Sequence, residues 1–269
     1  MVGPKKQRLD LLLVERKLAE SLDRARRLIG SGQVCIDHRL SDKAGSLVAA
    51  DSLITLKGVK PFVSRGGDKL AAGLQGLQID PRGCICADIG ASTGGFTDCL
   101  LQAGARKVYS VDVGYGLLDW KLRQDPRVVV LERVNARYLT AAHIPECIDL
   151  AVIDASFISL EPLLAPLLPF FQGTIRILAL VKPQFQLPRD KIGPGGIVDD
   201  ASLHQQALAM VEQFGLDLGL HCAGVVASPV RGMKGNQEFF MLLTGSSPVN
   251  GGGMEKLEQG DGDAITTTR

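Results

Sequence analysis

The chain has 269 residues, 45% of them hydrophobic, and a formal net charge of +1. This length allows one large or two smaller domains, and the apolar content is ample for a buried core. The charge is uneven, because residues 1–65 carry 13 Lys or Arg against 7 Asp or Glu, whereas residues 66–269 carry 17 against 22. A basic N-terminal part on a mildly acidic body predicts that the N-terminal part binds a polyanion.

Several classes of protein are disfavoured by the residues themselves. The six cysteines form no C-x-x-C pair and no cluster with histidines, which predicts free thiols in a reducing compartment rather than zinc ligands or disulfides. Residues 1–6 contain no apolar region of the kind that a secretory signal needs. The most apolar stretch, 163–171, is short and contains two prolines, so it cannot span a bilayer. We expect a cytoplasmic protein with no metal and no membrane partner.

Two short helices are predicted within residues 8–30, the second with Ser21 as its N-cap. The apolar positions of the second helix recur at helical spacing and leave its arginines facing outward. Short strands are predicted to follow near 33–37 and at 53–57. An arginine-rich helix can be no more than a solvated surface, so this feature alone does not indicate a binding site.

The same segment resembles the S4 RNA-binding domain. It contains R-L-D-x-L-L from residue 8, then the arginine-rich helix, then a G-x-V turn into a strand. The resemblance implies contacts from arginines to phosphates, with the shape of the RNA recognised more than its sequence. The candidate RNA-binding residues are Arg8, Arg24, Arg26, Arg27 and Arg65.

A boundary is predicted where Pro61 and the Gly66-Gly67 pair interrupt the pattern. We expect an S4-like domain over 1–60, a short linker over 61–67, a larger domain over 68–245 and a disordered tail over 246–269. The first helix of the larger domain is predicted to begin at Asp68, with Lys69 in its first turn. Because the helix dipole disfavours a cation there, the position of Lys69 indicates a functional reason.

Residues 84–104 predict a strand, a glycine-rich turn and a helix, followed by a strand over 107–112. The turn has the spacing Gly90-x-x-x-Gly94-Gly95 rather than G-x-G-x-x-G, and Asp88 is expected within the loop. A carboxylate there would repel a pyrophosphate but suits an ammonium or a sulfonium. The stretch D-I-G-A-S-T-G-G-F resembles the S-adenosylmethionine loop of Rossmann-like methyltransferases, and Asp112 is placed to accept hydrogen bonds from a ribose.

The remaining elements alternate between helices and strands, which predicts an α/β fold of the Rossmann-like class. In order, these are a helix at 116–122, a buried strand at 128–131, a strand ending at Asp154, a proline-interrupted helix at 160–171, a strand ending at Lys182, a long loop at 187–200 that could lie over the active site, a helix at 202–214, and strands at 221–228 and 235–243. In this fold class the loop after the strand at 128–131 lies beside the adenine. Asn135 is therefore a candidate for base contact, although Asn is also an ordinary turn residue.

Four charged residues form a candidate catalytic set. Asp154 and Lys182 end successive strands, and Lys69 and Glu238 extend the set across the whole larger domain. A ribose 2′-hydroxyl is a very weak acid, so a nearby ammonium can stabilise the alkoxide that forms. A second lysine and two carboxylates can orient that ammonium and accept hydrogen bonds from the substrate. Taken singly, each of these residues is more often a surface charge or an ion-pair partner.

The ordered motifs over residues 7–244 resemble the hemolysin A/TlyA group of ribosomal RNA methyltransferases. They are S-R-G-G-D-K at 64–69, D-I-G-A-S-T-G-G-F-T-D at 88–98, V-D-V-G-Y-G at 111–116, D-x-S-F at 154–157, L-x-L-V-K-P-Q-F at 178–185 and G-N-Q-E at 235–238. The resemblance implies an S4 domain fused to a domain like that of the FtsJ/RrmJ ribose methylases, and 2′-O-methylation of cytidines in ribosomal RNA from S-adenosylmethionine.

The resemblance also assigns site residues. It places the catalytic tetrad at Lys69, Asp154, Lys182 and Glu238, with Lys182 facing the reacting hydroxyl. It places the cofactor region at Asp88, Gly90, Ser92, Gly94, Gly95, Asp112 and Asn135. Ribosomal RNA or ribosomal subunits are the implied partner.

Three other functions remain open at this point. D-A-S-F at 154–157 is loosely similar to the D-P-P-(Y/F) motif of amino methyltransferases, although both prolines are missing. A ribosome-binding assembly factor with a vestigial cofactor site is the alternative without catalysis. A hemolysin is disfavoured, because the sequence has no pore-forming or membrane segment.

Overall fold

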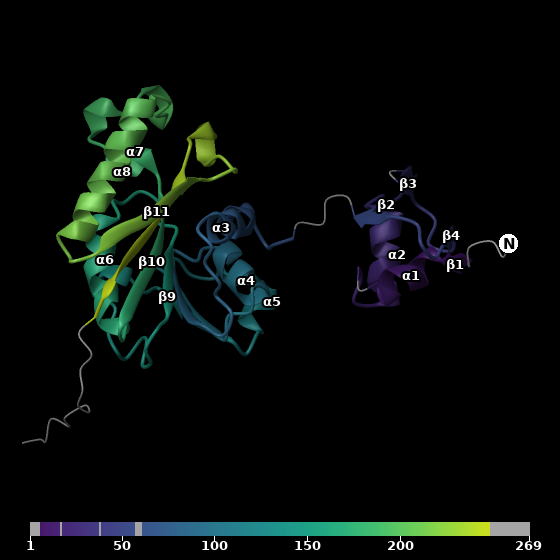
Figure 1. Ribbon diagram of the computed structural model, residues 1–269. Helices are drawn as coiled ribbons and strands as arrows, with labels where there is room; N and C mark the ends of the chain where they lie inside the picture. Colours follow the sequence, from purple (N-terminus) through teal and green to yellow (C-terminus); the bar gives the residue numbers. More distant parts are fainter. Residues whose placement is uncertain (1–5, 17, 38, 57–60, 248–269) are drawn as a thin grey trace, which may run out of the picture. The chain divides into compact units, whose positions relative to one another are not determined.

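The computed structural model describes residues 6–16, 18–37, 39–56 and 61–247. The chain folds as two compact units, Met1–Pro61 and Phe62–Arg269, which Figure 1 shows with their helices and strands labelled. None of the helices in the described ranges is long and apolar enough to cross a membrane.

The N-terminal unit is a small α+β fold with two helices, as the sequence predicted. Its elements are β1 (Lys6–Arg8), α1 (Leu9–Glu15), α2 (Leu22–Gly30), β2 (Val34–Ile36), β3 (Arg39–Ser41), β4 (Leu47–Ala49) and β5 (Ile54–Leu56). Ser21 is the N-cap of α2, since its side chain accepts a hydrogen bond from the Arg24 N–H at 3.2 Å. Strand β1 pairs with β4, and β2 lies between β3 and β5, all antiparallel. Strands β1, β3 and β4 were not predicted from the sequence.

The C-terminal unit is built on a seven-stranded sheet with the order β11-β12-β10-β9-β6-β7-β8. Strands β10, β9, β6, β7 and β8 are parallel, and β12 is antiparallel to both β10 and β11. The strands are β6 (Ile85–Ile89), β7 (Lys107–Asp112), β8 (Val128–Glu132), β9 (Leu150–Ile153), β10 (Thr174–Val181), β11 (His221–Ala227) and β12 (Phe239–Ser246). The α/β, Rossmann-like class predicted from the sequence is confirmed.

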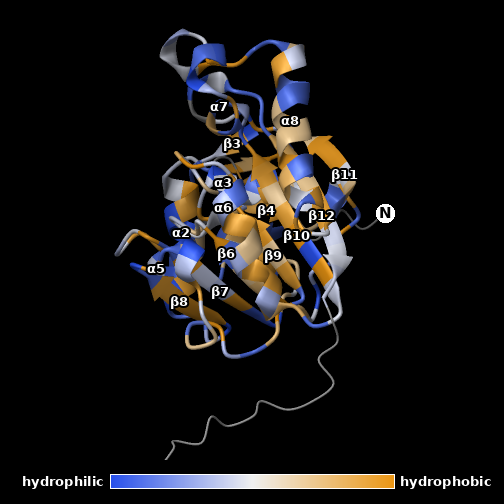
Figure 2. Cartoon of the chain, turned by 90° about the vertical axis from the view of Figure 1, so that its left-hand side faces the viewer, coloured by the Kyte–Doolittle hydropathy of each residue, from blue (hydrophilic) through white to orange (hydrophobic). Residues whose placement is uncertain are grey.

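Helices cover both faces of this sheet, so it is buried on two sides (Figure 1). The α-helices are α3 (Arg65–Gly76), α4 (Gly95–Gln102), α5 (Trp120–Arg123), α6 (Glu161–Leu164), α7 (Pro183–Gln186) and α8 (Ala201–Leu216), and the short 3₁₀ turns are η1 (Ala136–Tyr138), η2 (Ala165–Phe170), η3 (Arg189–Lys191), η4 (Pro194–Gly196) and η5 (Met233–Gly235). Leu70 of α3 and Leu100 of α4 belong to one apolar core, and Leu164 of α6 and Val211 of α8 belong to the other. The central strands are correspondingly apolar in Figure 2.

Helix α3 begins earlier than the sequence predicted. It begins at Arg65, three residues before Asp68, and Ser64 is its N-cap. The Gly66-Gly67 pair lies inside the helix rather than interrupting it. A Cβ on Gly67 would come within 2.2 Å of the Phe62 ring. These glycines therefore allow close packing. Lys69 consequently lies beyond the first turn, where the dipole argument loses its force.

Three further elements differ from the prediction. Helix α5 begins only at Trp120, since Asp119 caps it and Gly116 has a left-handed φ of +72°. Strand β8 is half-buried rather than buried, because it is the edge of the sheet. Strand β12 begins at Phe239, after the 3₁₀ turn η5, rather than at residue 235. In the expected tail, Ser246 ends β12, and residues 248–269 lie outside the described residues.

Candidate active site

A cavity of about 640 Å³ opens at the carboxyl ends of the parallel strands β6, β9 and β10. The rim of the cavity comes from segments far apart in the sequence: the start of α3, the glycine-rich turn before α4, the residues that follow β9 and β10, the loop between α7 and α8, and the segment before β12. The four residues of the predicted catalytic set, Lys69, Asp154, Lys182 and Glu238, all line it. The structure therefore brings this set together, as the argument from strand ends predicted.

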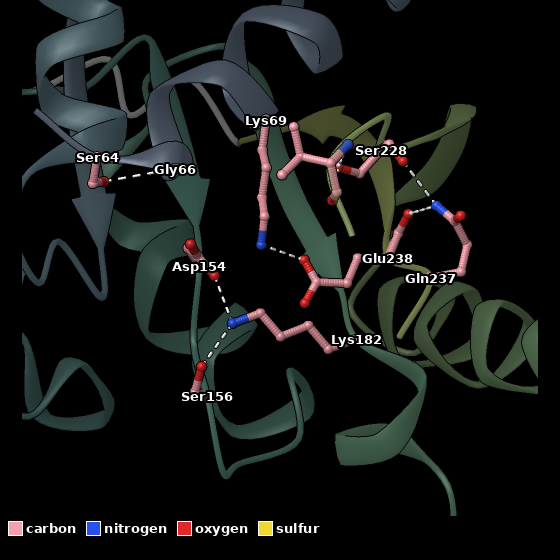
Figure 3. A network of polar contacts seen from close by, with 10 residues as sticks. Ser64, Gly66, Lys69, Asp154, Ser156, Lys182, Ser228, Gln237 and Glu238 are labelled. Atoms are coloured by element: carbon pink, nitrogen blue, oxygen red, sulfur yellow. Dashed lines mark hydrogen bonds and ion pairs between the residues drawn. The ribbon is translucent and has the colours of Figure 1, made fainter. Parts of the chain in front are cut away.

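The four charges form two ion pairs (Figure 3). Lys69 Nζ donates to Glu238 Oε2 at 2.6 Å, and their side chains are 13% and 3% exposed. Lys182 Nζ lies 2.6 Å from Asp154 Oδ1 and donates to Ser156 Oγ at 2.7 Å. Both lysines are thus largely withdrawn from water, and each has a carboxylate beside it, without which a buried ammonium would be strongly destabilising.

Strand geometry explains why these residues meet. Asp154 follows the last residue of β9, and Lys182 follows the last residue of β10. Glu238 precedes β12, and the antiparallel register pairs Val181 with Phe239, so Glu238 lies beside Lys182 across the two strands. Each position is therefore set by the backbone and not by a long flexible segment.

Helix α3 delivers Lys69 to the same point. A Cβ on Gly73 would come within 2.7 Å of the Phe240 ring, so this glycine lets α3 lie directly on β12. Lys69 is one turn before Gly73 and reaches Glu238, two residues before Phe240. A larger residue at position 73 would move the helix and its lysine away from the carboxylate.

The Lys182 ammonium is arranged to bind an oxygen in the cavity. An ammonium has three N–H donors and no acceptor. The contacts to Asp154 and Ser156 engage two directions, and the side chain lines the cavity. A substrate oxygen that gains negative charge beside Lys182 would be stabilised without reorganisation of the site.

The glycine-rich turn forms another wall of the cavity. Gly90 has a φ of +85°, and a Cβ there would meet the Asp154 carbonyl oxygen at 2.6 Å. Gly90, Ser92 and Gly95 line the cavity, but Gly94 does not. A Cβ on Gly94 would come within 2.2 Å of Leu122, and one on Gly95 would come within 2.2 Å of Ser64 Oγ. Packing thus accounts for the glycines at 94 and 95 before any ligand is considered.

Asp88 corrects the expectation of an acid within the loop. It lies in β6, is fully buried and does not line the cavity. Its Oδ2 accepts a hydrogen bond from Thr97 Oγ1 at 2.6 Å, and Thr97 Oγ1 lies 2.7 Å from Ser110 Oγ. Burial raises the pKa of the Asp88 carboxyl to about 7, against the opposing effect of the Thr97 hydrogen bond. Among the described residues, no hydrogen-bond partner reaches Asp88 Oδ1.

Asp112 and Asn135 do not line the cavity either. Asp112 braces the turn, because its carboxylate accepts from the N–H groups of Ser92 at 2.8 Å and Gly114 at 2.7 Å. The Asn135 side chain accepts from the Arg137 N–H at 3.1 Å and so caps η1. Their contacts to a cofactor stay predictions.

The turn and helix α4 have the features that an adenosine ligand with a charged amino-acid end requires. Gly90 lines the cavity with a left-handed backbone, and the N-cap of α4, Gly94, has no side chain to cap the helix. The unpartnered Oδ1 of Asp88 is a buried acceptor behind the turn. These residues fit S-adenosylmethionine. In contrast, no group of three or more His, Cys, Asp or Glu side chains among the described residues is placed to hold a metal ion.

The candidate RNA-binding arginines fall into two environments. In the N-terminal unit, Arg8 forms two hydrogen bonds with the buried Asp10 carboxylate, at 3.0 and 2.8 Å, and Arg26 lies 3.3 Å from the same group. The hydrogen bonds from Arg8 are the main cause that lowers the pKa of Asp10 to about 2. Arg24 and Arg27 are exposed on α2, whereas Arg65 lines the cavity of the C-terminal unit.

Several cavity residues were not singled out from the sequence. Ser156 accepts a hydrogen bond from Lys182. Phe157 is 82% exposed, has a φ of +66°, and its ring lies 5.2 Å from that of Phe185. Gln184 has a buried Oε1 without a hydrogen-bond partner in the described chain. All of these lie inside the motifs D-x-S-F and V-K-P-Q-F. The motifs therefore indicated this part of the site, but the type of each single residue did not mark it as functional.

The loop at 187–200 reaches the cavity, as expected. Asn236, 2% exposed, accepts from the Val198 N–H at 2.9 Å and donates to the Gly196 carbonyl at 2.8 Å. Lys234 donates to the Gly195 carbonyl at 2.7 Å. Ile192 and Gly196 line the cavity. The G-N-Q-E motif thus fastens this loop as well as presenting Glu238.

Comparison with known proteins identifies the family of the chain. Residues 62–244 match the FtsJ-like methyltransferase family and residues 7–54 match the S4 domain. The chain is 44% identical over 241 residues to the 16S/23S rRNA (cytidine-2′-O)-methyltransferase TlyA of Mycobacterium tuberculosis, covering 89% of this chain and 90% of that protein. It is 46% identical over 242 residues to a Bacillus subtilis protein that is named provisionally as an rRNA methyltransferase, covering 89% and 86%.

A solved structure supports the same assignment. A protein of Streptococcus thermophilus, described provisionally as a hemolysin, superposes with a TM-score of 0.67 at 40% identity and covers 91% of this chain and 90% of that one. The resemblance found in the sequence motifs is therefore confirmed. The chain belongs to the FtsJ-like methyltransferases that carry an N-terminal S4 domain, the family of the TlyA and hemolysin A proteins.

Proposed function

We propose that this protein transfers a methyl group from S-adenosylmethionine to the ribose 2′-hydroxyl of cytidine in ribosomal RNA. The observation that carries the proposal is the pairing of two buried lysines with two carboxylates inside one cavity, beside the glycine-rich turn. When it is bound, S-adenosylmethionine supplies a methyl group on a positively charged sulfur. The N–H groups at the start of α4 and the Gly90 backbone would hold its amino-acid end.

Lys182 would act at the reacting oxygen. A 2′-hydroxyl becomes a nucleophile as its proton passes to a carboxylate in the cavity, such as Asp154, and the ammonium of Lys182 stabilises the negative charge that develops on the oxygen. Asp154 and Ser156 keep that ammonium in place at 2.6 and 2.7 Å. Lys69 and Glu238 form the second pair, which lies beside the first and would orient the ribose. Holding the ribose and the methyl donor in one geometry lowers the entropy cost of bringing them together.

The substrate class rests on relatives and on charge. The relative from M. tuberculosis is named for cytidine methylation of 16S and 23S rRNA. The S4 domain and the basic N-terminal segment fit a large RNA. An rRNA substrate would also place the activity in the cytoplasm, where the sequence analysis expects this protein.

Methylation of the base is the second candidate, and Phe157 is the observation in its favour. An exposed aromatic side chain at a cavity can stack on an extruded base. Base methylation does not explain the two lysine–carboxylate pairs, however, because an amino group needs no alkoxide stabilisation. Ribose methylation therefore accounts for more of the site.

Nucleoside analysis distinguishes the two reactions. Unmodified ribosomal subunits would be incubated with methyl-labelled S-adenosylmethionine and either the full chain or its Lys182→Ala variant. The proposal expects label in 2′-O-methylcytidine with the unaltered protein and almost none with the variant. Label in a base-methylated nucleoside with an intact ribose would reject the proposal, and so would equal labelling by the variant.

A further inference from the structure

The loop between β7 and α5 exposes an unusual number of large apolar side chains. Within residues 113–120, four such side chains are exposed, namely Val113 (69%), Tyr115 (68%), Leu117 (49%) and Trp120 (73%). Trp120 is the only tryptophan of the chain. Large apolar groups gathered on a surface commonly mark a binding site, whereas single exposed ones do not. We call this segment, residues 113–120, the aromatic loop.

Poor packing does not explain the exposure, because other side chains of the same segment are buried. Leu118 is 5% exposed, and Leu122 of the adjoining α5 is 1% exposed. Both pack where a Cβ on Gly94 would clash, at 2.8 and 2.2 Å. The segment thus inserts Leu118 and Leu122 into the core and holds Tyr115 and Trp120 outside.

Backbone hydrogen bonds hold the aromatic loop in one shape. The Gly114 N–H donates to Asp112 Oδ1 at 2.7 Å, and the Gly116 N–H donates to Glu132 Oε1 at 2.9 Å. The Asp119 N–H donates to the Thr93 carbonyl at 3.2 Å, and Thr93 lines the active-site cavity. The loop is therefore attached to the glycine-rich turn, which forms one wall of the cavity.

Cations accompany the exposed rings. The Arg133 guanidinium lies 4.3 Å from the centre of the Tyr115 ring, and the backbone N–H of Arg133 donates to the Gly114 carbonyl at 3.0 Å. Lys121 adjoins Trp120 with its side chain 66% exposed, although it also contacts Asp98 at 3.2 Å. The acidic residue of the loop, Asp119, uses Oδ1 to cap α5 at the Lys121 N–H. Exposed rings interleaved with cations match unpaired RNA, whose bases stack on the rings while its phosphates meet the cations.

We propose that the aromatic loop is a binding surface for an unpaired segment of the RNA substrate, with Trp120 and Tyr115 as stacking platforms for its bases. The surface would hold nucleotides next to the one whose ribose enters the cavity. This inference rests on the proposed function for the identity of the substrate as RNA, but it concerns binding and does not depend on which atom is methylated.

The intrinsic fluorescence of Trp120 can report whether RNA binds at the aromatic loop. Intrinsic fluorescence of the full chain would be recorded while a short oligocytidylate is added, without any methyl donor, and again with the same strand in a duplex. The proposal expects quenching, reduced access of acrylamide to Trp120 with the single strand, and a much weaker effect with the duplex. If RNA binds by an independent measurement such as filter binding, yet emission and access stay unchanged, the proposal is wrong.

Kinetics with unmodified ribosomal subunits gives the second test. Trp120→Ala is expected to raise KM for the subunits about tenfold and to leave kcat within about twofold, as loss of one stacked base would do. Trp120→Phe should retain most of the affinity, and Leu216→Ala, which truncates a half-exposed leucine on α8, should change neither constant.

Each other result overturns the inference. A rise only in KM for S-adenosylmethionine would make the loop part of the cofactor site. A response of Trp120 to isolated ribosomal proteins but not to RNA would make it a protein-docking surface. Failure of the proposed function remains distinguishable, because a base-methylated product, or no product at all, would leave the fluorescence result intact.

Discussion

The two units of the chain hold their cations in opposite ways. In the N-terminal unit, Arg8 and Arg26 are 48% and 53% exposed around the buried carboxylate of Asp10. In the C-terminal unit, Lys69 and Lys182 are 13% and 8% exposed and are paired inside one cavity. Exposed guanidinium groups remain available to a phosphate backbone, whereas a buried, paired ammonium is aimed at one atom. We infer that the first unit uses its charge for binding and the second for chemistry.

Removal of a buried cation should have the greatest effect on activity. Lys182→Ala should lower the rate of methyl transfer about 10³-fold, because the variant lacks the ammonium that stabilises the forming alkoxide. Affinity for RNA should be unchanged. Single-turnover methyl transfer and filter binding measure the two quantities. Lys191→Ala, an exposed lysine that donates to Gln206, is the matched control and should behave as the unaltered protein. A Lys182→Ala variant with full activity would show that the pair is only structural.

The carboxylate that organises the exposed arginines is the next target. Asp10→Asn should destabilise the N-terminal unit by about 2 kcal/mol at neutral pH, since it weakens hydrogen bonds from two charged partners to a buried group. Hydrogen exchange at the amides of α1 and α2 measures this locally in the full chain.

The pH dependence of the same contribution follows from the pKa of Asp10. Because the folded state lowers the pKa of this carboxyl to about 2, the stabilisation is present above about pH 4 and is lost as the pH falls toward 2. An asparagine side chain cannot ionise, so the Asp10→Asn variant should lack this dependence. An unchanged acid transition in the variant would contradict the assignment.

The smallest expected effect concerns the arginines that are free of Asp10. The double replacement of Arg24 and Arg27 by Ala should weaken RNA binding roughly tenfold. It should also lower the number of ions released on binding, measured from the salt dependence of the affinity, by about two. The value of kcat at saturating substrate should not change. Arg82→Ala, which removes an exposed arginine that precedes β6, serves as the control. An unaltered salt dependence of binding in the double variant would show that α2 does not contact the RNA.

The sequence predicted most of the site because strand ends are visible in it. Asp154 and Lys182 follow apolar runs, and parallel strands bring their carboxyl ends to one edge. Pairing partners were not predictable, because they depend on register. That Glu238 lies beside Lys182 follows from the pairing of Val181 with Phe239, and that Lys69 reaches Glu238 follows from the packing of Gly73 on Phe240.

Two errors have the same physical origin, which is that a residue type does not reveal its packing. The Gly66-Gly67 pair was interpreted as a break in the structure, but it lies in α3, and Phe62 occupies the space that a side chain on Gly67 would need. Asp88 was expected within the loop, yet the strand continues through it and buries it against Thr97. Tertiary contacts decide such positions, and a single sequence does not display them.

Alkaline hydrolysis of the labelled RNA shows whether the methyl group lies on the ribose. Alkali cleaves an RNA chain through attack of the 2′-oxygen on the neighbouring phosphate, so a methylated 2′-oxygen protects that linkage. After methyl transfer by the full chain from labelled S-adenosylmethionine, complete hydrolysis should release the label in alkali-resistant dinucleotides that begin with cytidine. Label recovered entirely in mononucleotides would contradict the account, because the methyl group would then lie on a base.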